Sequence, residues 1–190
     1  MGKMGKFDCK GMREFQKQLE NLQKTEKAFV EACAKNLAGR LLRLVIEKTP
    51  RGDYSREDEV TAKRNSKKHK KGEVYKKRVT PSGKNGGTLI RGWVSATQEE
   101  AKSGKGKPSR EEILEYANGL QVSRAGDTYR IDLINPVEYA SYVEHGHRTA
   151  NHKGWVRGRF MMTISEQELE RIAPKVLENR IKKYLEATMR

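Results

Sequence analysis

The chain has 190 residues, with 40 Lys or Arg against 25 Asp or Glu, and its formal net charge is +15. A charge of this size favours anionic partners, such as nucleic acid, an anionic membrane or an acidic protein surface. No apolar run approaches the roughly 20 residues needed to cross a bilayer, so we expect no membrane-spanning segment. Among the anionic partners we expect no membrane. The first residues lack the apolar segment of a secretory signal, and we expect the chain to be cytosolic when it is made.

Residues 12–48 predict one long amphipathic helix. Their apolar residues recur mostly at steps of three and four, which is the period of one helix face. The pair Thr49-Pro50 ends the segment, because the residue before a proline is disfavoured in the helical region. Such a stripe packs on the protein's own sheet or on a neighbouring subunit, and a coiled coil is the alternative. The stripe consists of Met12, Phe15, Leu19, Leu22, Phe29, Val30, Cys33, Leu37, Leu41, Leu44 and Val45.

Residues 51–87 differ from the rest of the chain in composition. They are rich in Lys, Arg and Gly and poor in apolar residues, so they cannot bury enough surface to order themselves. We therefore expect a flexible basic loop. A charge run of this kind is either a solvated segment or a surface that contacts nucleic acid or an acidic partner. The candidate binding residues, which stand against the single acid Glu73, are Lys63, Arg64, Lys67, Lys68, Lys70, Lys71, Lys76, Lys77 and Arg78.

The middle of the chain predicts short elements. Residues 88–98 predict a half-buried strand, because their larger side chains alternate along the segment. The next stretch, EEAKSGKGKPS, predicts a second flexible basic loop. Residues 109–119 predict a short helix that begins at a capping box of Ser109 and Glu112 and ends at Gly119.

The remaining elements are a hairpin and a helix. Residues 120–135 predict a β-hairpin, with Gly126-Asp127 at its turn. A C-terminal helix begins at a capping box of Ser165 and Glu168, or earlier, near Gly158 to Phe160. Pro174 lies within it and predicts a kink or a break into two helices, because proline removes a backbone hydrogen bond.

The order of these elements predicts an α+β fold. A small, mainly antiparallel sheet would pack against the long N-terminal helix and the C-terminal helix. We expect a single domain over residues 1–190, with residues 51–87 as a long basic loop insertion within it.

The stretch YASYVEHGHRT, residues 139–149, concentrates side chains that could bind a metal. Glu144, His145 and His147, with His152 nearby, support one hypothesis, a zinc or non-haem iron site in a metal-dependent nuclease. However, no second histidine pair, HExxH motif or cysteine pair supplies the remaining ligands. The sequence also lacks a nucleophile motif and a phosphate-binding loop. We therefore expect no catalytic residue, no metal and no cofactor.

The competing hypothesis treats the same stretch as a packed structural junction. Tyr142 and Val143 follow Tyr139 by three and four positions, so the three residues share one face of a helical turn. Ala140 permits close packing, and Gly146 can end the turn in the left-handed backbone region.

Glu144 would lie near the C-terminal end of this turn, where the helix dipole disfavours a carboxylate. We therefore expect it to have a cationic or hydrogen-bonding partner. The candidates are Arg148, Arg157 and Arg159, from the same chain or from a neighbouring one.

Several short motifs follow one another along the chain. The long helix is followed by Thr-Pro, either Thr49-Pro50 or Thr80-Pro81, and then by Gly-Thr-Leu-Ile-Arg-Gly-Trp. Tyr-Ala-x-Tyr-Val-Glu-x-Gly comes later, before Gly-Arg-Phe-Met-Met. This pattern resembles the neck and tail-completion proteins of tailed phages and prophages, a family of minor structural, head–tail joining proteins. The residues that carry it are Gly87, Thr88, Leu89, Arg91, Trp93, Tyr139, Ala140, Tyr142, Val143, Glu144, Gly146, Arg159 and Phe160.

The resemblance implies a virion structural protein without enzymatic activity. Such proteins form a ring, commonly a hexamer, that completes the tail tube or docks it to the head connector. The implied partners are other copies of the chain, head-connector or neck proteins, tail-tube proteins and packaged DNA. The implied location is the virion neck, after assembly in the cytoplasm of the bacterial host. The residues predicted at a subunit or structural junction are Arg91, Trp93, Tyr139, Ala140, Tyr142, Val143, Glu144, Gly146, Arg159 and Phe160.

The chain departs from the family pattern at three places. Residues 51–87 replace a brief turn, Gly92 stands where Ser is usual before Trp93, and His147 stands where Thr is common after Gly146. The insertion also supports an alternative function, a basic nucleic-acid-binding protein that uses this arm.

Overall fold

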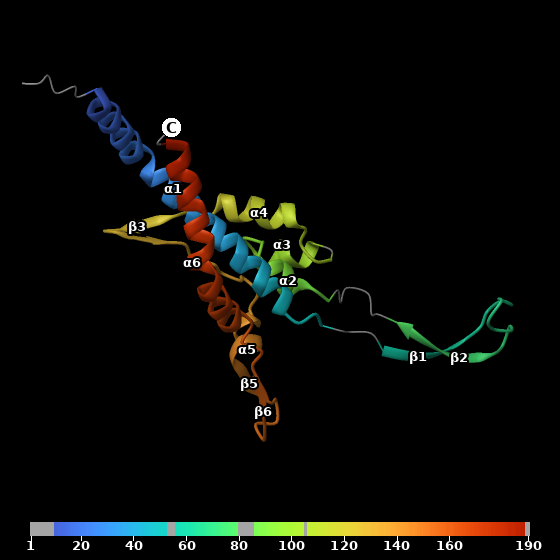
Figure 1. Ribbon diagram of the computed structural model, residues 1–190. Coiled ribbons are helices and arrows are strands. Elements are labelled where there is room, and N and C mark those ends of the chain that lie inside the picture. Colours follow the sequence, from blue (N-terminus) through green and yellow to red (C-terminus); the bar gives the residue numbers. More distant parts are fainter. Residues whose placement is uncertain (1–9, 53–55, 80–85, 105, 189–190) are drawn as a thin grey trace, which may run out of the picture. The chain divides into compact units, whose positions relative to one another are not determined.

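The computed structural model describes residues 10–52, 56–79, 86–104 and 106–188 (Figure 1). The Thr80-Pro81 motif lies outside these residues. The chain forms two compact units. The helical unit comprises Met1–Lys48, Ser109–Ile134 and Phe160–Arg190, and the second unit comprises Thr49–Pro108 and Asn135–Arg159. The predicted α+β class is confirmed, because long helices occur together with small two-stranded antiparallel sheets.

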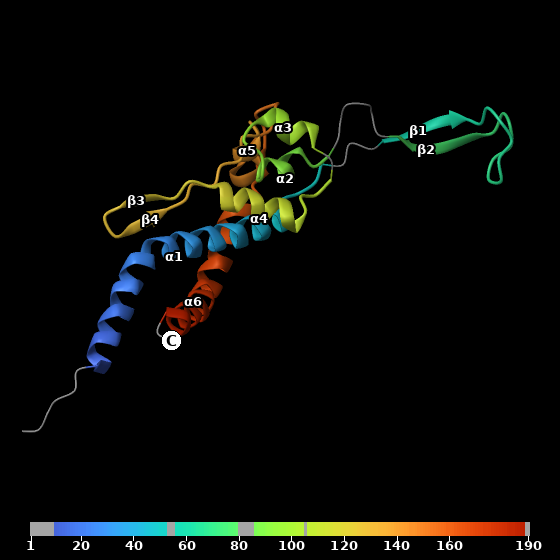
Figure 2. The same ribbon diagram turned by 90° about the horizontal axis from the view of Figure 1, so that it is seen from above.

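Two long helices form the body of the helical unit. Helix α1 spans Lys10–Lys48 and confirms the predicted N-terminal helix, and helix α6 spans Met161–Thr188. The two helices pack against each other, and Figure 2 shows the shorter helix α4 lying along α1. Leu42, Val45 and Ile46 are the most deeply buried residues of α1, with exposed fractions of 0%, 0% and 2%. The C-terminal half of α1 therefore provides the core of this unit.

Tyr184 of α6 fixes the contact between α6 and the first half of α1. Its ring stacks on Phe29, with ring centroids 4.1 Å apart. Its hydroxyl donates a hydrogen bond to the carbonyl of Leu22 over 3.0 Å and lies 2.6 Å from the hydroxyl of Thr25. At the other end of α1, Lys48 forms an ion pair with Glu168 over 2.5 Å. The Tyr184 side chain thus supplies both an aromatic stacking contact and a hydrogen bond between α6 and the first half of α1.

Helix α4 spans Arg110–Gly119, and its predicted capping box is confirmed. The hydroxyl of Ser109 accepts a hydrogen bond from the backbone N–H of Glu112 over 3.1 Å, and the Glu112 carboxylate accepts one from the Ser109 N–H over 2.7 Å. A Cβ atom on Gly39 of α1 would lie 3.4 Å from the Cβ of Ala117. Small residues on both helices therefore allow their backbones to approach closely.

Of the two outcomes predicted for Pro174, the break is wrong, because α6 runs unbroken from Met161 to Thr188, and the kink stays a prediction. The predicted helix start at the Ser165 capping box is also wrong. The helix begins four residues earlier, at Met161, which agrees with the alternative of an earlier start. Ser165 is fully buried, and its hydroxyl donates a hydrogen bond to the Met161 carbonyl over 2.6 Å. A serine that bonds back to the preceding turn fits a helix interior, which its sequence neighbours did not reveal.

The second unit contains three short helices. Helix α2 spans Thr88–Gly92, helix α3 spans Gln98–Ser103 and helix α5 spans Ala140–His145. The predicted strand over residues 88–98 is therefore wrong. Leu89, Ile90 and Trp93 are all buried at helical spacing, because a short apolar run fits a buried helical turn as well as a strand.

The loop predicted after residue 98 is wrong in its first half. Helix α3 begins with a capping box in which the Thr97 hydroxyl accepts a hydrogen bond from the Glu100 N–H over 3.3 Å. The Glu100 carboxylate accepts one in return from the Thr97 N–H. Ala101 is buried, so one small apolar residue suffices to anchor this turn.

The strands of the described residues form three separate two-stranded antiparallel sheets. The pair β3–β4, in the helical unit, confirms the predicted hairpin, although the second strand is shorter than expected and Gly126 lies at the turn with φ +61°. The pair β1–β2 lies within the segment predicted to be a flexible loop, which is a correction. None of the helices in the described part of the chain combines the length and apolarity of a membrane span. The strands are β1 Arg56–Thr61, β2 Val74–Val79, β3 Ser123–Ala125, β4 Thr128–Arg130, β5 Gly146–Arg148 and β6 Trp155–Arg157.

Candidate interaction surfaces

The predicted turn at Tyr139–Gly146 exists as helix α5, and two glycines hold it against the hairpin β5–β6. Gly146 ends the helix with φ +88°, and its N–H donates a hydrogen bond to the Tyr142 carbonyl. The Arg159 N–H donates one to the Val143 carbonyl over 2.8 Å. A Cβ atom on Gly158 would lie 2.2 Å from the Glu144 carbonyl oxygen. Glycine is therefore required at this crossing of two backbones.

The side chains of this junction are distributed differently from the prediction. Tyr139 and Tyr142, which were expected to pack, are 40% and 58% exposed. Glu144 is buried instead, with an exposed fraction of 8%. A buried carboxylate requires compensating partners, and Glu144 does engage in polar or electrostatic contacts. Its pairing with one of the three candidate arginines stays a prediction.

The exposed face of the junction has the composition of a protein interface. Trp155 and Val156 of β6 are 63% and 44% exposed. The ring of His147 lies 5.9 Å from that of Tyr142, tilted by 60°. Exposed aromatic residues and arginines are enriched where proteins bind one another. The exposed residues of the junction come from α5, from both faces of the hairpin β5–β6 and from the residues beside them, and are together called the junction face: Tyr139, Tyr142, His147, Arg148, Trp155, Val156, Arg157 and Arg159.

The histidines do not form a metal centre with other ligands in the described part of the chain. Among these residues, no three His, Cys, Asp or Glu side chains gather closely enough to hold an ion. His145 lies at the end of α5, and His147 lies on β5. His152 occupies the turn between β5 and β6 with φ +56°.

In the second unit, Trp93 is buried and Arg91 is half-buried. The Trp93 indole N–H donates a hydrogen bond to the Thr49 hydroxyl over 2.9 Å. Arg91 packs against Gly104, where a Cβ atom would lie 1.7 Å from the arginine Nε. The predicted Thr-Pro and Gly-Trp motifs therefore meet in space, and they position side chains inside the unit. Phe160 lies in the helical unit, directly before α6, with φ +51°.

Asn135 connects helix α2 to the segment that leads into α5, a role that no motif in the sequence indicates. Its side-chain N–H donates a hydrogen bond to the Leu89 carbonyl over 2.9 Å, and its Oδ1 accepts one from the Val137 N–H over 3.2 Å. A Cβ atom on Gly92 would lie 2.2 Å from this Oδ1. The Asn135 amide therefore leaves no room for a side chain at position 92, which explains why Gly92 stands where the family pattern has Ser.

The nine predicted basic residues lie on the hairpin β1–β2, where they fall into two groups. On the strands, acidic residues of β1 are opposite basic residues of β2. Opposite charges at facing positions of an antiparallel pair stabilise it. The three facing pairs are Glu57 with Arg78, Asp58 with Lys77, and Glu59 with Lys76. The strands therefore balance most of their own charge.

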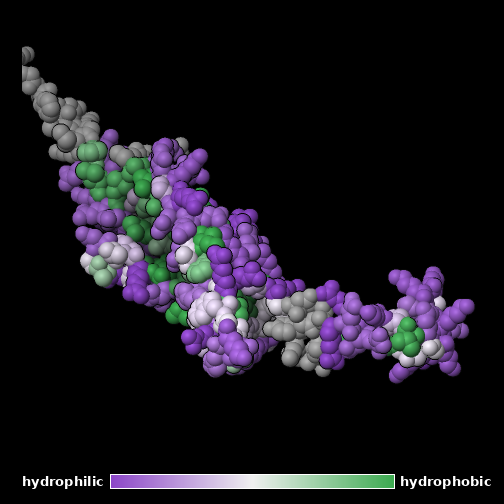
Figure 3. Space-filling view, turned by 90° about the horizontal axis from the view of Figure 1, so that it is seen from below, coloured by the Kyte–Doolittle hydropathy of each residue, from purple (hydrophilic) through white to green (hydrophobic). Residues whose placement is uncertain are grey.

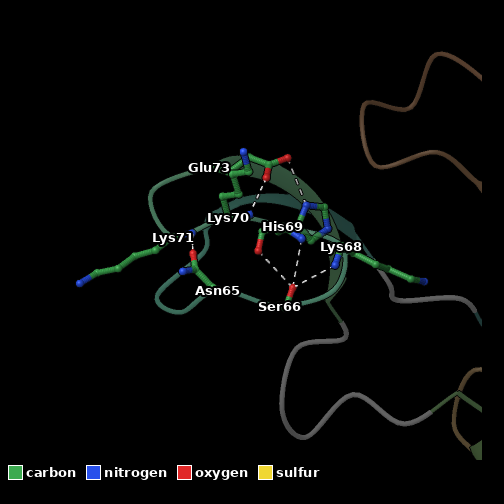
Figure 4. A network of polar contacts seen from close by, with 7 residues as sticks. All are labelled: Asn65, Ser66, Lys68, His69, Lys70, Lys71 and Glu73. Atoms are coloured by element: carbon green, nitrogen blue, oxygen red, sulfur yellow. Dashed lines mark hydrogen bonds and ion pairs between the residues drawn. The ribbon is translucent and has the colours of Figure 1, made fainter.

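The other six basic residues lie at the tip, residues 62–73, which is folded by its own polar contacts (Figure 4). The Ser66 hydroxyl accepts a hydrogen bond from the His69 N–H over 3.1 Å, and the Asn65 side chain accepts one from the Lys71 N–H over 2.7 Å. The Glu73 carboxylate accepts one from the Lys70 N–H over 2.8 Å. This bond, with a second from His69, holds the pKa of Glu73 below its usual value.

An open groove of about 680 Å³ lies in the helical unit, between α1, strand β4 with the segment that follows it, and α6. Its lining is mostly apolar and includes Leu37, Leu41, Leu133 and Leu169. Ile134 at its margin is 68% exposed. Figure 3 shows hydrophobic residues at the surface of this unit. A large apolar surface of this kind commonly marks a binding site.

Comparison with protein-family models matches residues 13–146 to the HK97-gp10-like family, described as a bacteriophage HK97-gp10 tail component. The match covers more than half of the chain and extends from α1 to the end of α5. Searches of curated proteins and of solved structures gave no match.

Proposed function

Because the chain belongs to the HK97-gp10-like family of phage tail components and is thus a structural protein of the virion, we propose that it is a subunit of the neck ring. In this proposal the ring joins the tail tube to the head connector, or completes the tube, and has no enzymatic activity. The match bears out the resemblance that the sequence motifs suggested. The ring and its position are our extension of it.

The observation that carries the proposal is the uncovered apolar surface of the helical unit. Phe15 and Leu19 of α1 and Ile181 of α6 are 46%, 47% and 45% exposed, in addition to the apolar groove. Burying apolar surface stabilises association by about 25 cal/mol per Å², before the entropy cost of association is subtracted. We infer that another copy of the chain covers the groove in the assembled tail.

A closed ring requires two different surfaces on each subunit, because each copy contacts its neighbours head to tail. The apolar groove supplies one surface. The junction face, with Trp155, Tyr142 and three arginines, supplies a second surface of different chemistry. We propose that these two surfaces form the heterologous contact. Six-fold symmetry and contacts with the connector and tail-tube proteins follow from the family resemblance.

The substitution Ile134→Asp tests the groove. A carboxylate at this exposed margin would have to be buried without a partner when the next copy binds, so we expect association to weaken about 30-fold, or about 2 kcal/mol. Sedimentation velocity and native mass spectrometry of the chain mixed with tail tubes would measure the effect. Val74→Asp, at a residue of β2 that is 61% exposed, is the matched control. Equal assembly of the two variants would contradict the assignment of the groove.

A further inference from the structure

The tip of hairpin β1–β2 carries an excess of positive charge in an ordered loop. All six of its basic side chains are exposed, and Glu73 is the single acid between residues 62 and 73. We propose that this tip binds the phosphate backbone of double-stranded DNA without reading its sequence. The six residues are Lys63, Arg64, Lys67, Lys68, Lys70 and Lys71.

The register of the strands confines the charge to the tip. Three carboxylates of β1 face three basic side chains of β2, so the stem of the hairpin repels and attracts an anion almost equally. The tip lacks such balance, since its one carboxylate is engaged by the Lys70 N–H and by His69. An approaching polyanion would therefore be drawn to residues 62–73.

The tip is preorganised, which lowers the entropy cost of binding. Its ends are joined by hydrogen bonds from the Ala62 N–H to the Glu73 carbonyl over 2.8 Å and from the Gly72 N–H to the Ala62 carbonyl over 2.9 Å. Figure 4 shows the side chains of Lys68 and Lys71 extending away from the polar network inside the loop. The backbone amides are thus used internally, and the lysine ammonium groups are left to bind.

The chemistry of the tip favours phosphate over an acidic protein surface. Protein interfaces bury aromatic and apolar residues and are depleted in lysine, whereas contacts to the DNA backbone are made by Lys and Arg. Five of the six basic residues are lysines, and Figure 3 shows the hairpin to be mainly hydrophilic.

The aromatic residues favour duplex over single-stranded DNA. The rings of His69 and Tyr75 stack on each other, with centroids 3.9 Å apart. Proteins that bind single strands instead present aromatic rings on which successive bases stack. The proposal rests on the hairpin alone and is independent of the ring.

The test compares two triple variants of the full chain that lose the same charge. Lys67, Lys68 and Lys71 are replaced with Gln in the tip variant, and Lys17, Lys24 and Lys175, which are exposed residues of α1 and α6, are replaced with Gln in the control. Affinity for a short duplex of mixed sequence is measured by fluorescence anisotropy over a series of KCl concentrations. Circular dichroism verifies that both variants keep the fold.

We expect the tip variant to bind the duplex roughly 100-fold more weakly than the unmodified chain at about 0.1 M salt. The slope of log K against log[KCl] should become shallower by about 2 to 3, because three phosphate contacts are lost. The control should lose less than about fivefold, since its changes act only through the long-range field. Equal losses in both variants, or tighter binding of polyglutamate than of duplex by the unmodified chain, would overturn the proposal. Incorporation of the tip variant into particles tests the ring separately.

Discussion

Replacing Gly158 with alanine is expected to lower the free energy of unfolding by at least about 3 kcal/mol. The new Cβ would lie 2.2 Å from the Glu144 carbonyl oxygen, 2.6 Å from the His145 carbonyl carbon and 2.8 Å from the Gly146 nitrogen. All three are backbone atoms, which cannot rotate away as a side chain would. Helix α5 and strand β6 would have to separate, and the bond from the Arg159 N–H to the Val143 carbonyl would be lost. Urea denaturation followed by circular dichroism measures the change.

Gly154→Ala is the matched control, because Gly154 directly precedes strand β6 and Gly158 directly follows it. A Cβ atom there would be 3.5 Å from the Thr149 side chain, which is ordinary contact. We expect this variant to unfold within about 0.5 kcal/mol of the unmodified chain. Equal stability of the two alanine variants would show that the two backbones do not cross at Gly158.

Replacing Trp93 with alanine is expected to destabilise the second unit by about 3 to 5 kcal/mol. Trp93 is 5% exposed, so the substitution leaves a large cavity. It also removes the donor to the Thr49 hydroxyl, which is itself in a buried residue. The lost hydrogen bond adds to the cost of the cavity. Thermal unfolding followed by circular dichroism gives the magnitude.

The second tryptophan provides the control. Trp155 is 63% exposed, and we expect Trp155→Ala to change stability by less than about 1 kcal/mol. The chain has two tryptophans, so this variant also leaves Trp93 as the one indole reporter of the core. If Trp155→Ala were the more destabilising of the two, the burial of Trp93 and its bond to Thr49 would be wrong.

The long helices could be predicted from the sequence because their signals repeat over many residues. The apolar period of α1 and the stop at Thr49-Pro50 agree with each other, and the capping box at Ser109 marks the start of α4. Such consistency between pattern and termini makes a prediction strong. At Ser165 the same capping motif was misleading, because the helix had already begun at Met161.

The short elements could not be predicted from local sequence in the same way. Helix α2 is five residues long, and its position depends on Asn135, which is distant in sequence and bonds to the Leu89 carbonyl. Helix α3 did carry a capping signal at Thr97 and Glu100, but the lysines and glycines that follow favoured a loop. Tertiary contacts routinely outweigh such weak local preferences.

The hairpin β1–β2 could have been predicted from the order of its charged residues, but not from the average composition of the segment. Residues 51–87 are basic on average, yet the acids of β1 and the bases of β2 stand at matching distances from the tip. Averaging the charge over the segment removed this pattern. At the α5 junction the backbone turn was predictable from Gly146, whereas the burial of Glu144 depends on residues beyond the motif.

Electron microscopy of the phage particle that carries this chain tests the central claim most directly. We expect a closed ring of six copies at the neck, between the head connector and the tail tube, with α1 and α6 of each copy at the contact between neighbours. An antibody label on the chain should mark the same position. The account would be contradicted if the chain were absent from the finished particle, or if the label marked the far end of the tail.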